Sequence, residues 1–324
     1  MMAVQKRSAG VRTLRLLLRT FLIVFIFLNI IAAFHAWKFT HFYDGAATVR
    51  LKPEQMSGWQ KTKAALFGIT YYKSENKEQP ALPFKTIPLK TAGGLTLQSW
   101  YINKDSSKGT VIMFHGHGSS KSKILREAYA MHAMGYAVLL TDFRAHGGSG
   151  GNACTIGYDE ANDVKAAYDY IQQQGEKNIV LWGISLGAAT TARAISVFKL
   201  QPSKLIMEMS FGSLEQAVKG RVRIMGLPEQ PIATLLSFWG GTEHGFWAFN
   251  HNPQDYVKDI QCPLLVQWGR LDARVTEAET QTIFANAAST AKKLVVYETA
   301  KHESLLDKEP EKWKNEVGAF LSQQ

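Results

Sequence analysis

The chain has 324 residues, enough for one large domain with additions or for two small domains. Its formal net charge is +10, but five Lys and Arg residues lie within the first 19 positions, and no acidic residue precedes Asp44. The rest of the chain has no basic run and no alternation of basic and aromatic residues, which argues against a nucleic-acid-binding protein. We therefore expect no nucleic-acid partner.

A basic tail at residues 1–19 leads into residues 20–37, a run of 18 without a formal charge. A helix of about 20 apolar residues crosses a bilayer. A cleavable signal peptide is the alternative, but its apolar core usually has about 7–15 residues and ends in small residues. Ile31-Ala32-Ala33 is a mediocre cleavage site, and Trp37 with Lys38 suits a membrane interface.

The sequence therefore predicts an uncleaved transmembrane anchor over residues 20–37. Basic residues flanking a span tend to stay in the cytoplasm. We expect a single-pass protein with its N-terminus cytoplasmic and its large domain periplasmic or extracellular.

Residues 38–80 are expected to form a juxtamembrane linker with a short amphipathic helix over 57–67. The main domain is expected over residues 81–324. The two cysteines, Cys154 and Cys262, are more typical of small apolar packing than of a disulfide.

Beyond residue 81, short apolar runs alternate with longer segments of helical character. Strands are predicted over residues 84–89, 95–102, 110–114, 136–141, 178–182, 204–209, 263–268 and 293–297, and helices over 122–134, 161–174, 188–198, 277–287 and 311–321. This alternation predicts an α/β domain, a mainly parallel sheet flanked by helices on both faces. Ligands bind such sheets at the carboxyl ends of the strands.

The segment from Gly183 to Gly187, with Ser185 at its centre, joins one such strand to one such helix. A sharp turn of this kind raises a serine hydroxyl above the sheet, where it can act as a nucleophile. The five-residue pattern alone is weak, since an ordinary tight turn with an incidental serine fits it equally. The residues after the other strands decide between the two interpretations.

His115-Gly116-His117-Gly118 follows an earlier strand. Acyl transfer needs two backbone N–H groups directed at the developing oxyanion. Leu186, after the serine, and His117 are the candidates for an oxyanion hole. A turn with two incidental histidines and a metal-binding pair are the alternatives, but no further ligand lies nearby at a suitable spacing. We expect no metal and no cofactor.

Asp272 and His302 follow the last two predicted strands. Histidine is the side chain best suited to take a serine proton near neutral pH, and a carboxylate can hold its ring. The order Ser185, Asp272, His302 is the one expected of α/β hydrolases. These three residues are the predicted catalytic triad.

From about residue 82 onward the chain resembles the α/β-hydrolase superfamily, and within it the bacterial Bem46-like or serine-aminopeptidase-like (S33-type) group. The matching motifs are HGHGSSKS at 115–122, DFRAHGGSGG at 142–151, GISLG at 183–187, WGRLDARV at 268–275 and KHES at 301–304. Ala145 stands where many relatives have glycine. The resemblance implies an α/β-hydrolase fold and esterase-type hydrolysis, and it does not imply a substrate.

Residues 211–261 form an insertion that the strand–helix alternation does not require, and we expect a small helical cap there. Its aromatic side chains are candidate substrate-binding residues, namely Phe238, Trp239, Phe246 and Trp247. Two other interpretations remain open: these side chains fill the core of the cap, or they contact the membrane near the anchor.

Together these features predict a membrane-anchored serine hydrolase that cleaves a carboxylic ester or a related acyl bond through an acyl-enzyme. Its substrate would be a small-molecule or lipid-like acyl compound. A serine peptidase, an acyltransferase or thioesterase, and a non-catalytic anchored scaffold are the alternatives.

Overall fold

The computed structural model describes residues 9–45 and 56–323, and in that part of the chain it contains one eight-stranded sheet. The strands are β1 (Lys85–Lys90), β2 (Thr96–Ile102), β3 (Thr110–Phe114), β4 (Ala137–Thr141), β5 (Ile179–Ile184), β6 (Lys204–Glu208), β7 (Leu264–Gly269) and β8 (Lys292–Tyr297). Their spatial order is β1-β2-β4-β3-β5-β6-β7-β8. Only the pairings β1–β2 and β2–β4 are antiparallel, so the predicted mainly parallel sheet is confirmed.

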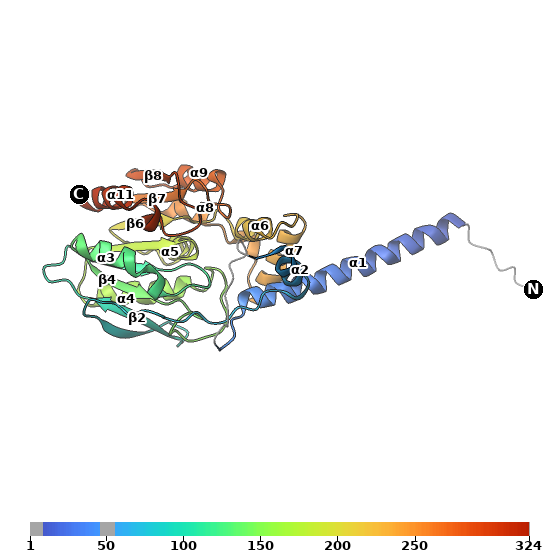
Figure 1. Cartoon of the computed structure of the whole chain (residues 1–324), viewed down its shortest axis with the longest axis horizontal. Coiled ribbons are helices and arrows are strands. Elements are labelled where there is room, and N and C mark those ends of the chain that lie inside the picture. The colour runs from blue at the N-terminus through green and yellow to red at the C-terminus, as the bar shows by residue number, and fades with distance from the viewer. Residues whose placement is uncertain (1–8, 46–55, 324) are drawn as a thin grey trace, which may run out of the picture.

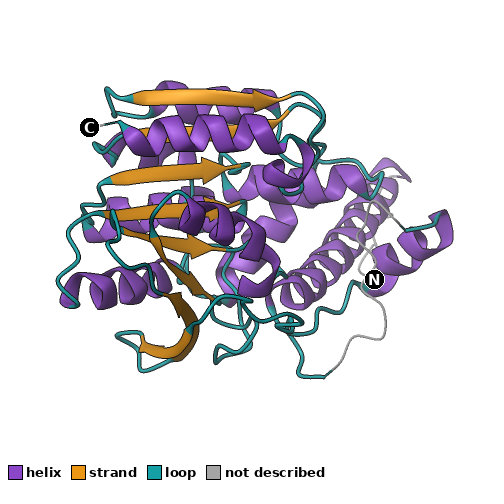
Figure 2. Cartoon of the chain, turned by 60° about the vertical axis from the view of Figure 1, so that its left-hand side comes forward, coloured by secondary structure: helices purple, strands orange, loops and turns teal. Residues whose placement is uncertain are grey.

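Helices cover both faces of this sheet (Figure 2). One face carries α3 (Leu125–Ala133), which follows the 3₁₀ turn η2 (Lys121–Ile124), together with α10 (Leu305–Lys308) and α11 (Pro310–Ser322). The other face carries α4 (Ala161–Gln173), α5 (Leu186–Phe198) and α9 (Glu277–Asn286). Strands β3, β4 and β7 are buried along their whole length, as parallel strands between two helical layers must be.

The expected cap lies between β6 and β7. This segment contains α6 (Leu214–Ile224), α7 (Ile232–Glu243), η3 (Ala248–Asn250), α8 (Pro253–Tyr256) and η4 (Val257–Asp259). Helix α8 packs against α5 and α9, so the end of the insertion belongs to the helical layer of the main domain. The cap itself is α6 and α7, which share a small core of Val218, Val222 and Ala233.

Helix α1 (Ala9–Thr40) projects from the body of the molecule (Figure 1). Residues 10–28 are exposed on every side, whereas Ala32 and Ala36 are buried against the cap. Near this contact the indole N–H of Trp239 in α7 donates to Asn29 Oδ1 at 3.0 Å. Residues 28–37, predicted to lie in the membrane, therefore also pack against the cap.

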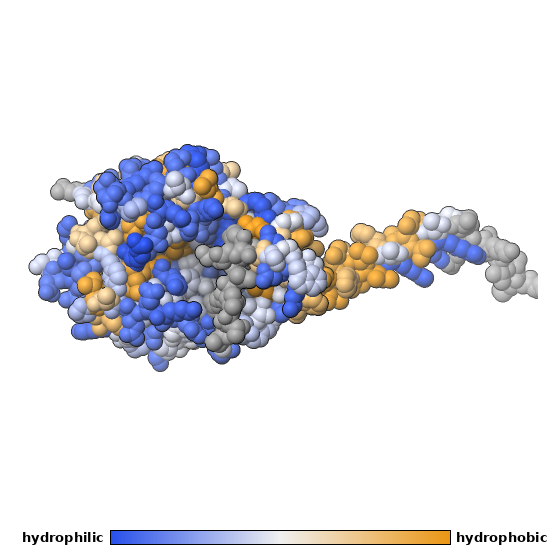
Figure 3. Space-filling view, in the orientation of Figure 1, coloured by the Kyte–Doolittle hydropathy of each residue, from blue (hydrophilic) through white to orange (hydrophobic). Residues whose placement is uncertain are grey.

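Among the described residues, one helix, Gly10–Thr40, is long and apolar enough to cross a membrane. Its length and composition suit a membrane anchor and a signal sequence alike. The projecting part is seen as a largely hydrophobic rod in Figure 3.

The expected linker contains the predicted short helix, α2 (Gly58–Phe67), whose N-terminus is capped reciprocally by Ser57 and Gln60. Its large apolar side chains, Trp59, Leu66 and Phe67, are all exposed. The Lys61 ammonium donates to the Ile224 carbonyl at 2.8 Å and joins α2 to the cap.

The segments on either side of α2 pack against the main domain. The Phe42 N–H donates to the Asn152 carbonyl at 2.7 Å, and the Cys154 N–H donates to the Thr40 carbonyl at 2.8 Å. Phe42 itself is buried in the main hydrophobic core. Part of the segment expected to be a linker is therefore integral to the domain, which an irregular segment without apolar periodicity does not reveal.

Candidate active site

Ser185 occupies the turn between β5 and α5 with φ +55° and ψ −111°, a conformation that non-glycine residues rarely adopt. A Cβ atom on Gly183 would lie 2.3 Å from the Gly187 carbonyl carbon. One on Gly187 would lie 2.3 Å from the Phe114 carbonyl oxygen. Both glycines are therefore required by close backbone contacts, and the Ser185 N–H is held by the Glu208 carbonyl at 2.8 Å.

A chain of hydrogen bonds joins the three residues that the sequence singled out. Ser185 Oγ lies 3.0 Å from His302 Nε2, and His302 Nδ1 lies 2.7 Å from Asp272 Oδ2. When the carboxylate is ionised, Nδ1 carries the imidazole proton, so that Nε2 accepts from the serine hydroxyl. The fold thus brings together residues from the loops after β5, β7 and β8.

The Asp272 carboxylate is itself held in place. Its Oδ1 accepts the backbone N–H groups of Arg274 at 2.7 Å and Val275 at 3.0 Å. Because one oxygen is occupied by the loop, the other is left directed at His302. The buried carboxylate can then stabilise an imidazolium cation without rearrangement.

Leu186 and His117, the expected oxyanion donors, line a small cavity of about 40 Å³ together with Ser185 and His302. Leu186 is the first residue of α5, so its N–H has no acceptor within the helix. The arrangement suits stabilisation of a negative charge beside the serine.

The ring of His117 is buried and stacks on Phe39 with a centroid separation of 4.7 Å. Phe39 lies near the end of α1 and also lines the small cavity. The N-terminal helix therefore contributes to the pocket of Ser185, which the sequence analysis did not anticipate. The available signal was the helical spacing of apolar residues toward the end of α1.

Two further buried histidines hold the loops around this pocket. His115 Nε2 accepts the Phe143 N–H at 3.2 Å, and His146 Nε2 accepts the Gly118 N–H at 3.0 Å. Burial lowers the pKa of both rings, that of His146 to about 3, so both are neutral. In residues 9–45 and 56–323, no group of three or more His, Cys, Asp or Glu side chains is placed to hold a metal ion.

Asp142 ties several loops together below the pocket. Its buried carboxylate forms an ion pair with the buried Lys121 ammonium and accepts the Lys121 and Gly148 N–H groups at 2.7 and 2.8 Å. It also accepts from the Asn76 amide at 2.7 Å. The glycine-rich segment at 142–151 is therefore organised by its own carboxylate, as expected of a structural loop.

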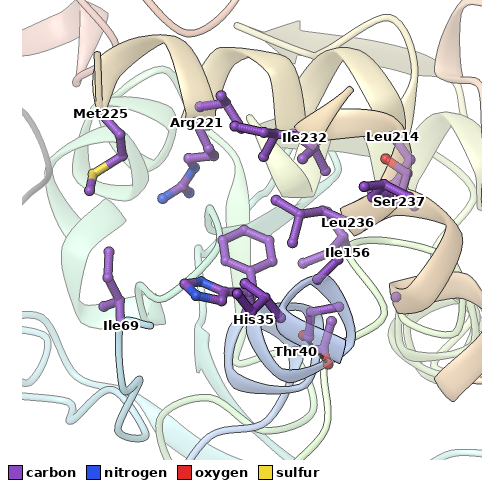
Figure 4. Close-up of a pocket in the computed structure, with 18 of the residues that line it drawn as sticks. His35, Thr40, Ile69, Ile156, Leu214, Arg221, Met225, Ile232, Leu236 and Ser237 are labelled. Carbon is purple, nitrogen blue, oxygen red and sulfur yellow. Dashed lines mark hydrogen bonds between the residues drawn. The ribbon is translucent and has the colours of Figure 1, made fainter. Parts of the chain in front are cut away.

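A larger cavity of about 290 Å³ lies between α1 and the two cap helices (Figure 4). Of the four aromatic residues expected to bind substrate, Phe246 lines this cavity. Phe238 and Trp247 are exposed, and Trp239 instead bonds to Asn29. The lining that α7 contributes is mainly aliphatic, with Ile232, Leu235 and Leu236 at helical spacing.

Known proteins resemble this chain in sequence and in fold. A family model described as serine aminopeptidase, S33, matches residues 105–212. The uncharacterized protein Rv2307c of Mycobacterium tuberculosis is 28% identical over 218 residues, which cover 65% of this chain and 70% of that protein.

Solved structures of esterases extend this likeness. The esterase Pf2001 of Pyrococcus furiosus is 26% identical with a TM-score of 0.64, over 77% of this chain and 96% of that one. An esterase of Exiguobacterium antarcticum, 18% identical, matches in fold with a TM-score of 0.56 over 74% of this chain and 100% of that one. The chain thus has the α/β-hydrolase fold, and these likenesses support a hydrolase of the esterase type that resembles the S33 group, as its motifs predicted.

Proposed function

We propose that the protein is a membrane-anchored serine hydrolase that cleaves a carboxylic ester or a related acyl bond. The observation that carries this proposal is the continuous hydrogen-bonded series Asp272–His302–Ser185. A serine hydroxyl is a weak nucleophile unless an adjacent base removes its proton, and this arrangement supplies the base and the group that orients it.

In the first half of the reaction, His302 Nε2 takes the Ser185 proton while Oγ attacks the acyl carbon. The N–H groups of Leu186 and His117 bind the resulting oxyanion, and Asp272 stabilises the imidazolium. The tetrahedral intermediate expels the alcohol, which takes the proton from His302. An ester between Ser185 and the acyl group remains.

In the second half, His302 removes a proton from water, which attacks the acyl-enzyme. The second tetrahedral intermediate collapses, Ser185 recovers its proton from His302, and the acid leaves. The cycle uses only groups of this chain and water.

The cavities favour an acyl substrate over a peptide. A free α-amino group is a cation, and an aminopeptidase binds it most simply with a carboxylate. Among the residues that line the two cavities, none is Asp or Glu. The lining of the larger cavity is mainly apolar and suits an uncharged chain.

The packing of α1 supports an uncleaved anchor. The helix continues past the candidate cleavage site at Ala33, and both Ala32 and Ala36 are buried against the cap. Removal of the helix up to Ala33 would remove Leu28, Ile31 and Ala32 from the lining of the larger cavity. The basic residues before position 20 favour a cytoplasmic N-terminus and an outward-facing hydrolase domain. A C-terminal reporter active only in the cytoplasm should be silent, and full reporter activity would contradict this orientation.

Labelling with a fluorophosphonate tests the assignment of Ser185. In detergent, the full-length protein should be labelled and should hydrolyse 4-nitrophenyl acetate. Ser185→Ala should do neither, whereas Ser196→Ala on the same helix should do both. Equal labelling of wild type and Ser185→Ala would contradict the proposal that Ser185 is the nucleophile.

A further inference from the structure

The cavity beside the triad has the N-terminal helix as one wall. The α1 residues that line it include Leu28, Ile31, Ala32, His35, Ala36 and Phe39. These positions recur every three or four residues and lie on one face of the helix. Figure 4 shows His35 and Thr40 of α1 on one side of the space, with Arg221, Ile232 and Leu236 of the cap on the other.

The inner end of the cavity adjoins the pocket of Ser185. Phe39, Val218 and Arg221 line both the larger cavity and the smaller one that contains Ser185 and His302. The Arg221 guanidinium lies 5.5 Å from the centre of the Phe39 ring. A ligand in the larger cavity would therefore contact side chains that also enclose the nucleophile.

The outer end lies where α1 leaves the body of the molecule. Two of the lining leucines, Leu28 of α1 and Leu227 of the cap, are 44% and 37% exposed. The 11-residue separation of Leu28 and Phe39 corresponds to a length of about 16 Å along the helix. An extended chain of about twelve carbons has a similar length, at about 1.3 Å per methylene.

Exposed apolar side chains gather on the elements that flank this end. Helix α2 exposes Trp59, Leu66 and Phe67, and the cap exposes Phe238 and Trp247. On the N-terminal side of Leu28, the apolar side chains of α1 are exposed. Figure 3 shows this part of the helix as a largely hydrophobic surface. Such surfaces mark contact with another apolar phase, and Trp is enriched where that phase is the boundary of a bilayer.

We propose that this cavity is an acyl channel by which a long-chain ester passes from the membrane to Ser185, with the anchor helix as one of its walls. The occupant is a single acyl chain of a membrane lipid ester. Its carbonyl lies at the inner end beside Ser185, and its tail extends along Ile31 and Leu28. The proposal rests on the proposed serine-hydrolase function and names the substrate class of that same site.

Filling the channel tests the inference. Full-length protein in phosphatidylcholine vesicles is assayed with 4-nitrophenyl dodecanoate and 4-nitrophenyl acetate. Leu236→Trp places an indole in the cavity, and Leu28→Trp places one at its outer end, where Leu28 is partly exposed. Val197→Trp on the exposed side of α5 is the matched control.

The wild type should prefer the dodecanoate. The ratio of kcat/KM for dodecanoate to that for acetate should fall about tenfold or more in Leu236→Trp and about threefold in Leu28→Trp. The reason is that an indole in the apolar cavity excludes part of the long acyl chain but leaves room for the acetyl group. The ratio should not change in Val197→Trp. Fluorophosphonate labelling reports whether each variant is folded.

Unchanged ratios in labelled Leu236→Trp and Leu28→Trp would overturn the channel while leaving the serine-hydrolase proposal standing. A wild type that prefers acetate would do the same. Loss of labelling in the wild type would instead remove the proposed function and the channel with it.

Discussion

The pocket of Ser185 and the cavity beside it are built by different means. The pocket is small, and its polar groups come from loops at the ends of β3, β5, β7 and β8, held by hydrogen bonds. The cavity is about 290 Å³ and is lined mainly by apolar side chains of helices α1, α6 and α7. The loops at the ends of the strands therefore fix the position of the candidate catalytic groups, whereas the helices shape the space beside them.

The largest effect is expected from Asp272→Asn, which alters the hydrogen-bonded series and leaves its shape unchanged. An amide N–H directed at His302 Nδ1 favours the tautomer with the proton on Nε2, which cannot accept from Ser185. We expect kcat for 4-nitrophenyl acetate to fall by about 10⁴-fold. Asp307→Asn, at an exposed ion pair with Arg126, should retain activity. A fall of less than tenfold in Asp272→Asn would show that the carboxylate is dispensable.

Two glycine substitutions contrast the rigid pocket with the cavity wall. In Gly187→Ala the new methyl would lie 2.3 Å from the Phe114 carbonyl oxygen, and we expect a loss of at least about 3 kcal/mol in unfolding free energy. In Gly240→Ala, on α7, the nearest atom is the Ala36 Cβ at 4.0 Å. The helix should there gain about 0.5–1 kcal/mol.

Thermal unfolding in detergent measures both changes. Similar transition temperatures for Gly187→Ala and Gly240→Ala would contradict the difference in tolerance between the two regions.

A buried acid beneath the pocket makes stability depend on pH. Glu208 Oε1 accepts from the indoles of Trp182 and Trp313 at 3.0 and 2.7 Å. Burial, with repulsion from Glu127, raises the pKa of Glu208 from 4.5 to about 8. The unfolded chain loses this proton at lower pH than the folded protein does. The unfolding free energy therefore falls as pH rises from about 4.5 to about 8 and levels off above that range.

Glu208→Gln keeps an acceptor oxygen and removes the titration. The stability of the variant relative to wild type should rise between pH 5 and pH 8, by on the order of a few kcal/mol. Unfolding at several pH values measures this difference, with Glu311→Gln on the exposed side of α11 as the control. A difference that stays constant with pH would mean that Glu208 is ionised throughout.

The smallest effect is expected where α1 meets the cap. Trp239→Phe removes the hydrogen bond to Asn29 Oδ1 and should cost about 1 kcal/mol. Trp247→Phe, on the exposed surface of the cap, should leave the unfolding temperature unchanged. If the two variants unfold alike, the contact between α1 and α7 contributes little to stability.

The strands of the sheet, and the residues placed at their carboxyl ends, could largely be predicted from the sequence. Each strand is a short apolar run, and parallel strands place Ser185, Asp272 and His302 at one edge, so chain order and spacing sufficed to group these residues. Their catalytic roles remain a proposal.

The helical region was less predictable. Residues 20–34 of α1 are apolar on nearly every side, so apolar periodicity does not show that the face with Ala32 is the one that packs. In the cap, bulky aromatic residues drew attention, whereas the cavity is lined chiefly by aliphatic side chains and reached by Phe39 from a distant helix. Such long-range packing leaves no local pattern beyond the helical spacing of apolar residues toward the end of α1.

The join between α1 and the body has a mechanical consequence. The Thr40 carbonyl accepts the Cys154 N–H, and the N–H groups of Phe42 and Tyr43 donate to the carbonyls of Asn152 and Tyr71. These bonds attach the end of the helix directly to the domain. With α1 embedded in a bilayer, Ser185 would be held at one depth and one tilt relative to the lipid surface. The enzyme would then encounter its substrate by lateral diffusion within the membrane, in two dimensions. Esters dissolved in the surrounding water would approach Ser185 in a less favourable orientation than esters within the bilayer.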